Sequence, residues 1–441
     1  MVWRRAGAAV AALVVLLLLP APAAFAEHVC DAPPPSGQAL AGTPYANQLY
    51  PSSALAPLAT GAGVRVAVID SGVRADVPAL RGRVAAGADF LHHDPDGRQD
   101  CVGHGTEVAS LIVGRAGRDS GFQGLAPGAT IVPVRVSEEE DDQGGGTSGD
   151  RVSFGGFADA IDWAVDEGHA DVINLSLVTT EGNTPVRAAV SRAIEKGVVV
   201  VAAAGNHGRP DDPNPTPFPA AYPGVIGVGA LTASGVRADY SQHGPYVDVV
   251  AAGDGITAAL PGGGLKVDSG TSFAAPFVAA TAALIRQRFP DATPAEVARR
   301  IEATTDPAPG GPVPGASPGD DAARNPEYGF GLLNPYRALT ETLGPASPAA
   351  AVPEMMRAED PAAAARAARR GHSQRMSLLM ALGGLGAVLV IGVAAVVVRR
   401  GRRRGWQPAV PAEPVPAEPV PAQPVPTQRV HPDRSREPLN R

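Results

Sequence analysis

Short apolar runs separated by longer mixed segments dominate the middle of the chain. Runs of this kind are typical of strands that are buried on both faces of a parallel sheet. The predicted strands cover residues 64–69, 131–136, 172–175, 198–203 and 225–228. Segments with helical periodicity lie between several of them, at 154–167 and 185–196. This alternation predicts an α/β fold with a doubly wound parallel sheet and helices on both faces.

A different apolar stretch occupies the start of the chain. Residues 1–26 combine an early pair of arginines with an apolar run and the small-residue sequence Ala24-Phe25-Ala26. This order predicts a secretory signal peptide that is cleaved before Glu27. An uncleaved membrane anchor is the alternative, and the short apolar core disfavours it. We therefore expect the rest of the chain to be exported.

A second such stretch, residues 376–398, carries no charge and is long enough to span a bilayer. A buried helix of a soluble domain is the alternative. Arginines flank the stretch and continue as a cluster after it, and such clusters stay on the cytoplasmic side. The sequence thus predicts one C-terminal transmembrane helix in the cell membrane, with the large domain extracytoplasmic and the C-terminal tail cytoplasmic.

These segments divide the 441-residue chain into six predicted parts. They are a signal peptide (1–26), a Pro-, Ala- and Ser-rich N-terminal extension (27–60), a folded domain (61–340), a Pro/Ala-rich linker (341–375), the span (376–398) and a basic, Pro-rich tail (399–441). The extension shows little periodicity, so we expect it to be irregular. The tail repeats Pro-Ala-Glu-Pro-Val, which favours an extended polyproline conformation, either solvated or bound to a cytoplasmic partner.

The charge balance narrows the possible partners. The formal net charge is -7, and Lys196 and Lys266 are the only lysines. No basic stripe of the kind that follows a phosphate backbone is evident in the sequence of the folded part. We therefore exclude nucleic acid as a partner. The hydrophobic content of 44% is enough for a large core.

Three short motifs stand where the predicted elements end or begin. Asp70 ends Val-Ile-Asp after the first strand, His104 lies in Gly-His-Gly-Thr before a helical pattern at 106–113, and Ser272 precedes another at 273–288. A hydroxyl needs an imidazole to take its proton and a carboxylate to orient that imidazole. Each residue alone also fits a turn, a surface histidine or a helix cap. In the order Asp, His, Ser they together predict a catalytic triad.

Residues around the triad predict an oxyanion site. Asn206 follows the apolar run 198–203, and its amide can donate to a tetrahedral oxygen alongside the backbone N–H of Ser272. An Asn in a tight turn is the alternative reading. A helix start also favours a developing negative charge.

Small residues and one proline flank these motifs. We expect Gly103, Gly105 and Gly270 to allow close approach of a substrate backbone. We expect Pro276 to be tolerated because the first helical turn has no internal hydrogen bond to lose.

Cys30 and Cys101 are the only cysteines. An even number in an exported chain predicts one disulfide, which would join the N-terminal extension to the loop that leads into His104. Two unpaired thiols are the alternative.

Two polar clusters invite a metal interpretation. The acidic stretch 138–150 has consecutive acids rather than the alternating ligands of a calcium loop, so we interpret it as a solvated loop. His92, His93, Asp94 and Asp96 surround a strong turn signal, and an exposed turn is the favoured interpretation. We expect no metal and no cofactor.

On its active-site motifs, and on Tyr-Gly-Phe-Gly-Leu-Leu-Asn-Pro at 328–335, the chain resembles the subtilisin family of serine proteases over roughly residues 61–340. The resemblance implies a subtilisin-like fold, with Asp70, His104 and Ser272 as the triad and Asn206 as the oxyanion residue. Its overall architecture resembles more narrowly the mycosins, the membrane-anchored subtilases of type VII secretion systems. That resemblance implies association with secretion-machinery membrane proteins and an extension that wraps the domain rather than acting as a removable propeptide.

The sequence-based hypothesis is a membrane-anchored serine endopeptidase that acts on protein or peptide substrates. The alternative is a scaffold of the secretion membrane complex whose proteolysis is narrow or dispensable. Residues 176–179 read Ser-Leu-Val-Thr where many secreted subtilisins have Ser-Leu-Gly-Gly in the specificity cleft. Neither the pocket preference nor the pairing of substrate with this segment follows from the resemblance.

Overall fold

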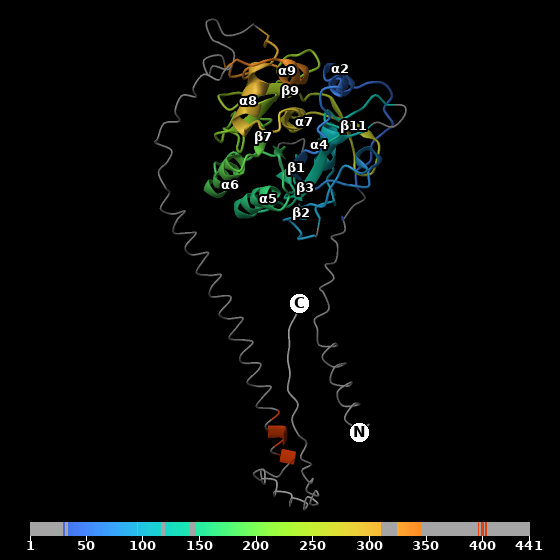
Figure 1. The fold of residues 1–441 in the computed structure, drawn as a ribbon, viewed down its shortest axis with the longest axis vertical. Helices are drawn as coiled ribbons and strands as arrows, with labels where there is room; N and C mark the ends of the chain where they lie inside the picture. Colours follow the sequence, from blue (N-terminus) through green and yellow to red (C-terminus); the bar gives the residue numbers. More distant parts are fainter. Residues whose placement is uncertain are drawn as a thin grey trace, which may run out of the picture. The chain divides into compact units, whose positions relative to one another are not determined.

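The computed structural model describes residues 30, 34–94, 96–115, 120–141, 147–309, 324–344, 396, 398–400 and 402–403 (Figure 1). It divides into a unit of Met1–Pro345 and a unit of Ala346–Arg441. The predicted signal peptide and nearly all of the predicted span 376–398 lie outside the described residues. Among the residues that are described, no helix combines the length and the apolarity that crossing a bilayer requires.

A seven-stranded sheet forms the centre of the first unit, and each neighbouring pair of its strands is parallel (Figure 1). In spatial order the strands are β2 (Ala88–Asp89), β3 (Thr130–Arg135), β1 (Arg65–Asp70), β6 (Val172–Leu175), β7 (Val199–Ala203), β8 (Val225–Leu231) and β9 (Val249–Ala252). Strands β2 and β3 lie on one side of β1, and strands β6 to β9 lie on its other side. Such a reversal makes a crevice beyond the carboxyl end of the central strand, where Asp70 lies.

Helices cover both faces of this sheet, as predicted. In β1, Val66 and Val68 share a core with the helices of one face, and Ala67 and Ile69 share a core with those of the other. This follows from the alternation of side chains along a strand. The first face carries α4 (His104–Val113) and α7 (Thr271–Arg288), and the second carries α5 (Phe154–Asp166) and α6 (Thr184–Glu195). The α/β prediction is confirmed.

Several elements escaped the prediction. These are the edge strand β9, the antiparallel hairpin of β10 (Ile256–Ala259) and β11 (Leu265–Asp268), and the helices α8 (Pro294–Ala303) and α9 (Pro335–Thr340). The small elements η1 (Pro78–Leu80), β2, β4 (Glu140–Asp141) and β5 (Thr147–Ser148) escaped it as well. The start of α8 carries a sequence signal, because Thr293 and Glu296 form a capping box. Strand β8 also runs past the predicted end to Leu231, and α4 begins at His104 instead of Thr106.

The extension is not wholly irregular, because it contains α2 (Tyr45–Leu49) and α3 (Ser52–Leu55). Both helices are too short to be stable alone. They form where Tyr50 and Leu55 are buried, and the Tyr50 ring lies 5.2 Å from the Phe277 ring of α7. Tertiary packing, which periodicity does not reveal, decides the local structure here.

The earlier part of the extension pairs with the β10–β11 hairpin. Gln38 and Leu265 exchange backbone hydrogen bonds of 2.9 and 2.8 Å, and the Gly37 N–H donates to Gly263. The N–H of Gly262 donates to the carbonyl of Pro35. The extension therefore covers part of the outer edge of β11, which would otherwise present unpaired backbone groups.

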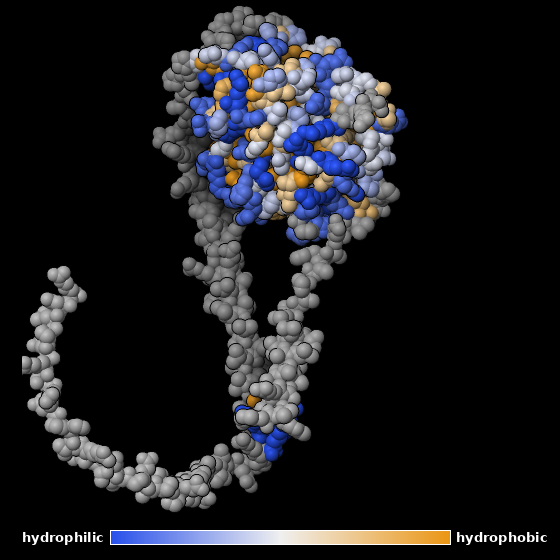
Figure 2. Space-filling view, turned by 45° about the vertical axis from the view of Figure 1, so that its right-hand side comes forward, coloured by the Kyte–Doolittle hydropathy of each residue, from blue (hydrophilic) through white to orange (hydrophobic). Residues whose placement is uncertain are grey.

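The face shown in Figure 2 intersperses polar residues with apolar ones. Among the described residues of the first unit, the exposed large hydrophobic side chains are Leu49, Val236, Val267 and Tyr336, and they come from separate elements. Scattered apolar residues are normal for a protein surface.

Cys30 and Cys101 form a disulfide, so the predicted pairing is confirmed. The bond joins residues that are 71 positions apart. It ties the extension to the loop three residues before His104.

Replacing both cysteines by serine is expected to lower the free energy of unfolding by about 4 kcal/mol, since the unfolded chain regains the freedom of a long loop. Urea denaturation of the variant and the parent measures this difference. Mild reduction of the parent serves as the control and should give the same loss. An unchanged unfolding midpoint in both would contradict the prediction.

Candidate active site

Asp70 and His104 meet at the carboxyl end of the sheet. Asp70 is the last residue of β1 and is 4% exposed, while His104 is the first residue of α4 and its side chain is 29% exposed. The Nδ1 atom of His104 lies 2.8 Å from Oδ1 of Asp70. This contact uses Nδ1 of the imidazole and leaves Nε2 to exchange protons with another group.

The glycines beside His104 allow close packing of the protein itself. Gly103 adopts a left-handed φ of 105°, and a Cβ there would lie 2.9 Å from Pro35 of the extension. A Cβ on Gly105 would lie 2.1 Å from the carbonyl oxygen of Gly72. The expectation that these two glycines serve substrate approach is replaced by this finding, because neighbouring chain already fills the space.

Ser272 is the second residue of α7 and is partly buried. The residues on either side of it contact the rest of the site. Thr271 hydrogen-bonds to Asn206, and the Phe273 ring packs edge-on against the His104 ring with 5.5 Å between centroids. Within the described part of the chain, no hydrogen bond joins the Ser272 hydroxyl to His104. Such bonds are often long in free enzymes and tighten with substrate.

The side-chain amide of Asn206 is oriented by Thr271. Its Oδ1 accepts from the Thr271 backbone N–H at 2.9 Å and from the Thr271 hydroxyl at 3.0 Å. The same hydroxyl accepts a hydrogen bond from the N–H of Gly205 and donates its own proton to Asn206. With Oδ1 occupied, Nδ2 is the group left to donate beside Gly270. Sequence reasoning missed Thr271, although it stands directly before the predicted nucleophile.

Pro276 has a different role from the one expected. It is the sixth residue of α7, so it lies beyond the first turn and removes a regular helical hydrogen bond. The carbonyl of Ser272 loses that partner and accepts instead from the hydroxyl of Ser176 at 2.7 Å. Asn174 donates to the same hydroxyl. The proline therefore frees a backbone group that fixes the start of α7 against the end of β6.

Three acidic groups surround the imidazole. Burial alone lowers the pKa of His104, but the charge and hydrogen bond of Asp70, with smaller contributions from Glu107 and Asp100, raise that pKa to about 9. Burial raises the pKa of Glu107 to about 7, against the opposing influence of His104 and Lys266. Glu107 and Asp100 were not predicted. For Glu107, the signal in the sequence was a carboxylate inside the apolar helical pattern that follows His104.

The raised pKa of His104 predicts an alkaline activity profile. The imidazole must be neutral to act as a general base. Because the pKa of His104 is raised from the ordinary 6.5 to about 9, kcat/KM should rise with pH over this range. Attraction between Asp70 and the charged imidazole stabilises the fold below pH 6.5 and is lost as pH rises through about 9.

A pH–rate profile on a peptide substrate tests this expectation. Urea unfolding of the parent and of a His104→Gln variant across the same range gives the matched stability measurement. An activity midpoint at or below pH 6.5 would contradict the assigned environment.

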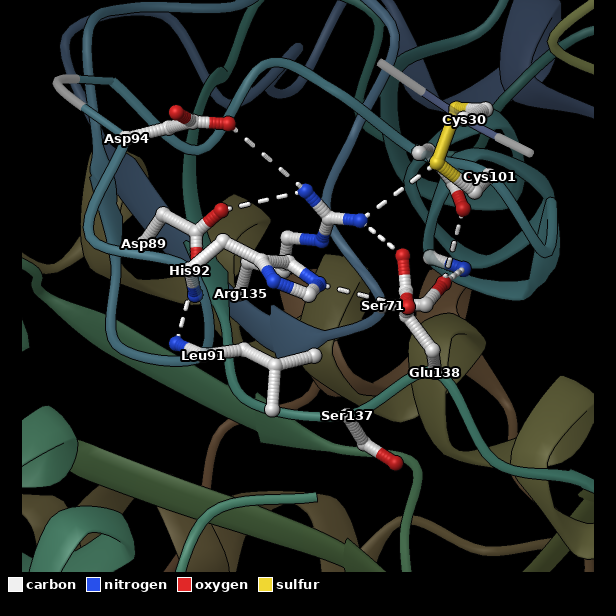
Figure 3. Close-up of polar contacts among 12 residues, drawn as sticks. Cys30, Ser71, Asp89, Leu91, His92, Asp94, Cys101, Arg135, Ser137 and Glu138 are labelled. Atoms are coloured by element: carbon white, nitrogen blue, oxygen red, sulfur yellow. Dashed lines mark hydrogen bonds and ion pairs between the residues drawn. A yellow bond between two sulfur atoms is a disulfide. The ribbon is translucent and has the colours of Figure 1, made fainter. Parts of the chain in front are cut away.

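Arg135, the last residue of β3, is fully buried behind this site. Figure 3 shows its guanidinium between Asp89 and Asp94 on one side and Glu138 and Cys101 on the other. Its nitrogens lie 3.1 Å from Asp89, 4.0 Å from Asp94 and 3.4 Å from the Cys101 sulfur, and it also pairs with Glu138. A buried arginine requires partners of this kind. It therefore links the loop before His104 to the segment after β3.

The histidine and acidic residues considered for metal binding take part in that network. Asp94 faces Arg135, and Nε2 of His92 lies 3.3 Å from Oε2 of Glu138 (Figure 3). Among the described residues, no group of three or more His, Cys, Asp or Glu side chains has the arrangement to hold a metal ion. The sequence signal for the network was a single arginine inside an otherwise apolar strand.

A cavity that is partly open to solvent lies beside the segment 177–179. Its lining is mostly apolar, with Glu139 and Arg151 among the lining residues, and these two form an ion pair of 3.5 Å. The other lining residues are Val136, Ser137, Val152, Phe154, Phe157, Leu177, Val178 and Thr179. The segment that departs from the common Ser-Leu-Gly-Gly pattern thus forms one wall of this cavity.

Known proteins have sequences similar to this chain. A profile of the Subtilase family matches residues 61–331. Subtilisin E of Bacillus subtilis (strain 168) is 39% identical over 245 residues, which is 56% of this chain. The chain spans 61% of the length of that subtilisin.

Other similarities reach further along the chain. Mycosin-1 of Mycobacterium tuberculosis (strain ATCC 25618 / H37Rv) is 35% identical over 393 residues, covering 78% of this chain and 82% of that protein. A solved structure of the serine protease MycP1, an essential component of the type VII (ESX-1) secretion system, matches with a TM-score of 0.58 and 32% identity. It covers 71% of this chain and 94% of that one. Together, the profile match and the extended similarity to Mycosin-1 show that this chain belongs to the subtilase family.

Proposed function

We propose that this protein is a serine endopeptidase in which Ser272 is the nucleophile, His104 the general base, Asp70 its orienting carboxylate and Asn206 the oxyanion donor. The observation that carries the proposal is the 2.8 Å contact between Asp70 and His104 beside the start of α7. Membership of the subtilase family and the similarity to Mycosin-1 support it.

In the proposed reaction the Ser272 hydroxyl attacks a peptide carbonyl while Nε2 of His104 takes the hydroxyl proton. Asp70 stabilises the imidazolium that results. The tetrahedral oxyanion accepts hydrogen bonds from Nδ2 of Asn206 and the backbone N–H of Ser272. Collapse of the intermediate breaks the C–N bond, and His104 returns the proton to the leaving amine. Water then hydrolyses the acyl-enzyme by the same route and regenerates Ser272.

The proposal includes a location. The signal-like residues 1–26 and the apolar stretch 376–398 support export and a single membrane span, with the peptidase domain extracytoplasmic and the arginine-rich tail cytoplasmic. The similarity to Mycosin-1 covers 78% of the chain, against 56% for subtilisin E. The added coverage supports an architecture shared with the mycosins.

A second function is proposed alongside proteolysis, namely a structural role in a secretion membrane complex. It rests on the similarity to MycP1, an essential component of the type VII (ESX-1) system. The partners would be membrane proteins of that machinery. Secretion by cells that carry Ser272→Ala separates the two roles. Continued secretion without peptide cleavage supports a scaffold role. Loss of both secretion and cleavage argues against a scaffold role that is independent of proteolysis.

Labelling with a fluorophosphonate probe tests the enzymatic proposal directly. The probe forms a covalent bond only with an activated, accessible hydroxyl, so the full chain should be labelled at Ser272, as mapped by mass spectrometry. Ser234→Ala, at an exposed serine, is the matched control and should label like the parent. A folded parent that remains unlabelled, or that is labelled at another residue, would refute the assignment of the nucleophile.

A further inference from the structure

A second carboxylate lies behind the Asp70–His104 pair. Asp100 is fully buried and stands four residues before His104. Its Oδ1 accepts from the Ser71 hydroxyl at 2.9 Å and from the Gly103 N–H at 2.7 Å. Its Oδ2 accepts from the backbone N–H and the hydroxyl of Thr106, at 2.8 and 2.5 Å. Both oxygens are therefore fully used.

These bonds cap the start of α4. The first N–H groups of a helix have no partner within the helix and need one from outside it. Asp100 takes those of Gly103 and Thr106, and the Ser71 hydroxyl takes that of Gly105 at 2.9 Å. Gly103 and Gly105 directly precede and follow His104, so the backbone on both sides of the imidazole is tied to Asp100 or to Ser71.

Ser71 connects this cap to the catalytic carboxylate. Its hydroxyl binds Asp100, and its backbone N–H donates to Oδ1 of Asp70 at 2.7 Å. The same Oδ1 contacts Nδ1 of His104. A continuous set of hydrogen bonds thus runs from the end of β1 through Ser71 and Asp100 to the first turn of α4.

We propose that Asp100 is a positioning residue for the hydrolysis described above: it holds the start of α4 against the end of β1 and so keeps His104 in bonding register with Asp70. Its negative charge also favours the imidazolium form of His104. The inference rests on the proposed function for its kinetic consequence, but the geometry of the Asp70–His104 contact can be measured without any activity.

A purely structural cap would behave differently from a positioning residue. Loss of a cap weakens the fold but leaves the reacting groups of the folded protein in place. Loss of a positioning residue lowers kcat in the folded protein while substrate binding is retained. Removal of a nearby negative charge also moves the titration of His104 to lower pH.

The test is Asp100→Asn in the full chain, which keeps the shape but replaces one acceptor oxygen by a donor. We expect kcat and the rate of fluorophosphonate labelling to fall about 10- to 100-fold, because small misplacements of a catalytic group have effects of this size. KM should stay within about twofold, and the midpoint of the pH profile should move to lower pH.

Asp248→Asn is the matched control. Asp248 is also a buried carboxylate that accepts from a backbone N–H, that of Gly227, but it precedes β9 at the amino-terminal edge of the parallel sheet. The control should lower thermal stability without changing kcat or the pH midpoint. If Asp100→Asn behaves in the same way, with only its stability lowered, the proposal is wrong.

Two further measurements keep the test decisive. Should Asp100→Asn fail to fold, Ser71→Ala removes the connecting hydroxyl and retains the Asp100 carboxylate; lowered kcat at unchanged KM then supports the proposal, and parent-like kcat overturns it. Should the parent itself neither label nor cleave, the proposed function fails, and proton NMR still decides the geometry. The Nδ1 proton of His104 gives a low-field signal. If this signal shifts or broadens in the Asp100 or Ser71 variant, and not in the Asp248 control, the result supports positioning by Asp100. An unmoved signal overturns the proposal.

Discussion

Replacing Ser272 by alanine is expected to lower kcat for peptide cleavage on the order of a million-fold, the magnitude known for removal of the nucleophile in subtilisin itself. The reason is that no other group is proposed to form the acyl-enzyme. Burst kinetics and steady-state cleavage of a chromogenic peptide, measured on the parent and the variant, give the size of the loss. KM should change little, since the hydroxyl contributes mainly to the reaction and not to binding.

The fold should survive this change. Ser272 is only partly buried, and the contact that fixes its backbone is made by its carbonyl with Ser176, which alanine retains. Thermal unfolding of the variant should therefore match that of the parent. Cleavage that persists at the parental rate, in protein free of contaminating proteases, would show that another residue is the nucleophile.

Replacing Asn206 is expected to produce the second-largest loss. In Asn206→Ala, kcat should fall about 100- to 1,000-fold with little change in KM, the range known for the oxyanion asparagine of subtilisin. The donor acts on a charge that exists only in the transition state, which explains why binding is spared. Steady-state kinetics on the same peptide measures both constants.

A second variant separates the loss of the donor from the loss of packing. Asn206→Asp keeps an oxygen where Thr271 donates, but it replaces the Nδ2 donor by an acceptor. If Nδ2 stabilises the oxyanion, this variant should be at least as slow as the alanine variant while keeping the Thr271 contacts. A near-parental kcat for Asn206→Asp would contradict the role assigned to the amide.

The sequence predicted the parts of the fold that depend on local patterns. Buried runs such as β6 and the helical pattern of α5 were placed within a residue of their observed ends, because burial imposes the same pattern along the whole element. The disulfide followed from a count of two cysteines. The residues proposed for catalysis were recognisable because each stands at the end of a patterned element, where a parallel sheet places its ligands.

The remaining features depend on contacts between distant segments. Nothing in the local pattern shows that Thr271 orients Asn206, or that Asp100 and Ser71 tie two elements together. Likewise, α2 and α3 form because Tyr50 and Leu55 are buried against the domain, and Pro276 is accommodated because Ser176, just after β6, replaces the missing hydrogen bond. Such information lies in pairs of residues and not in periodicity.

The pairing of the extension with the domain has a practical consequence for protein production. A truncated gene designed from the family match would begin at residue 61 and would delete the edge pairing of Gln38, the ring contact of Tyr50 and the bond of Cys30. It would uncover the apolar surface of α7 and leave Cys101 as an unpaired thiol, both of which promote aggregation. Recombinant fragments should therefore start upstream of Cys30.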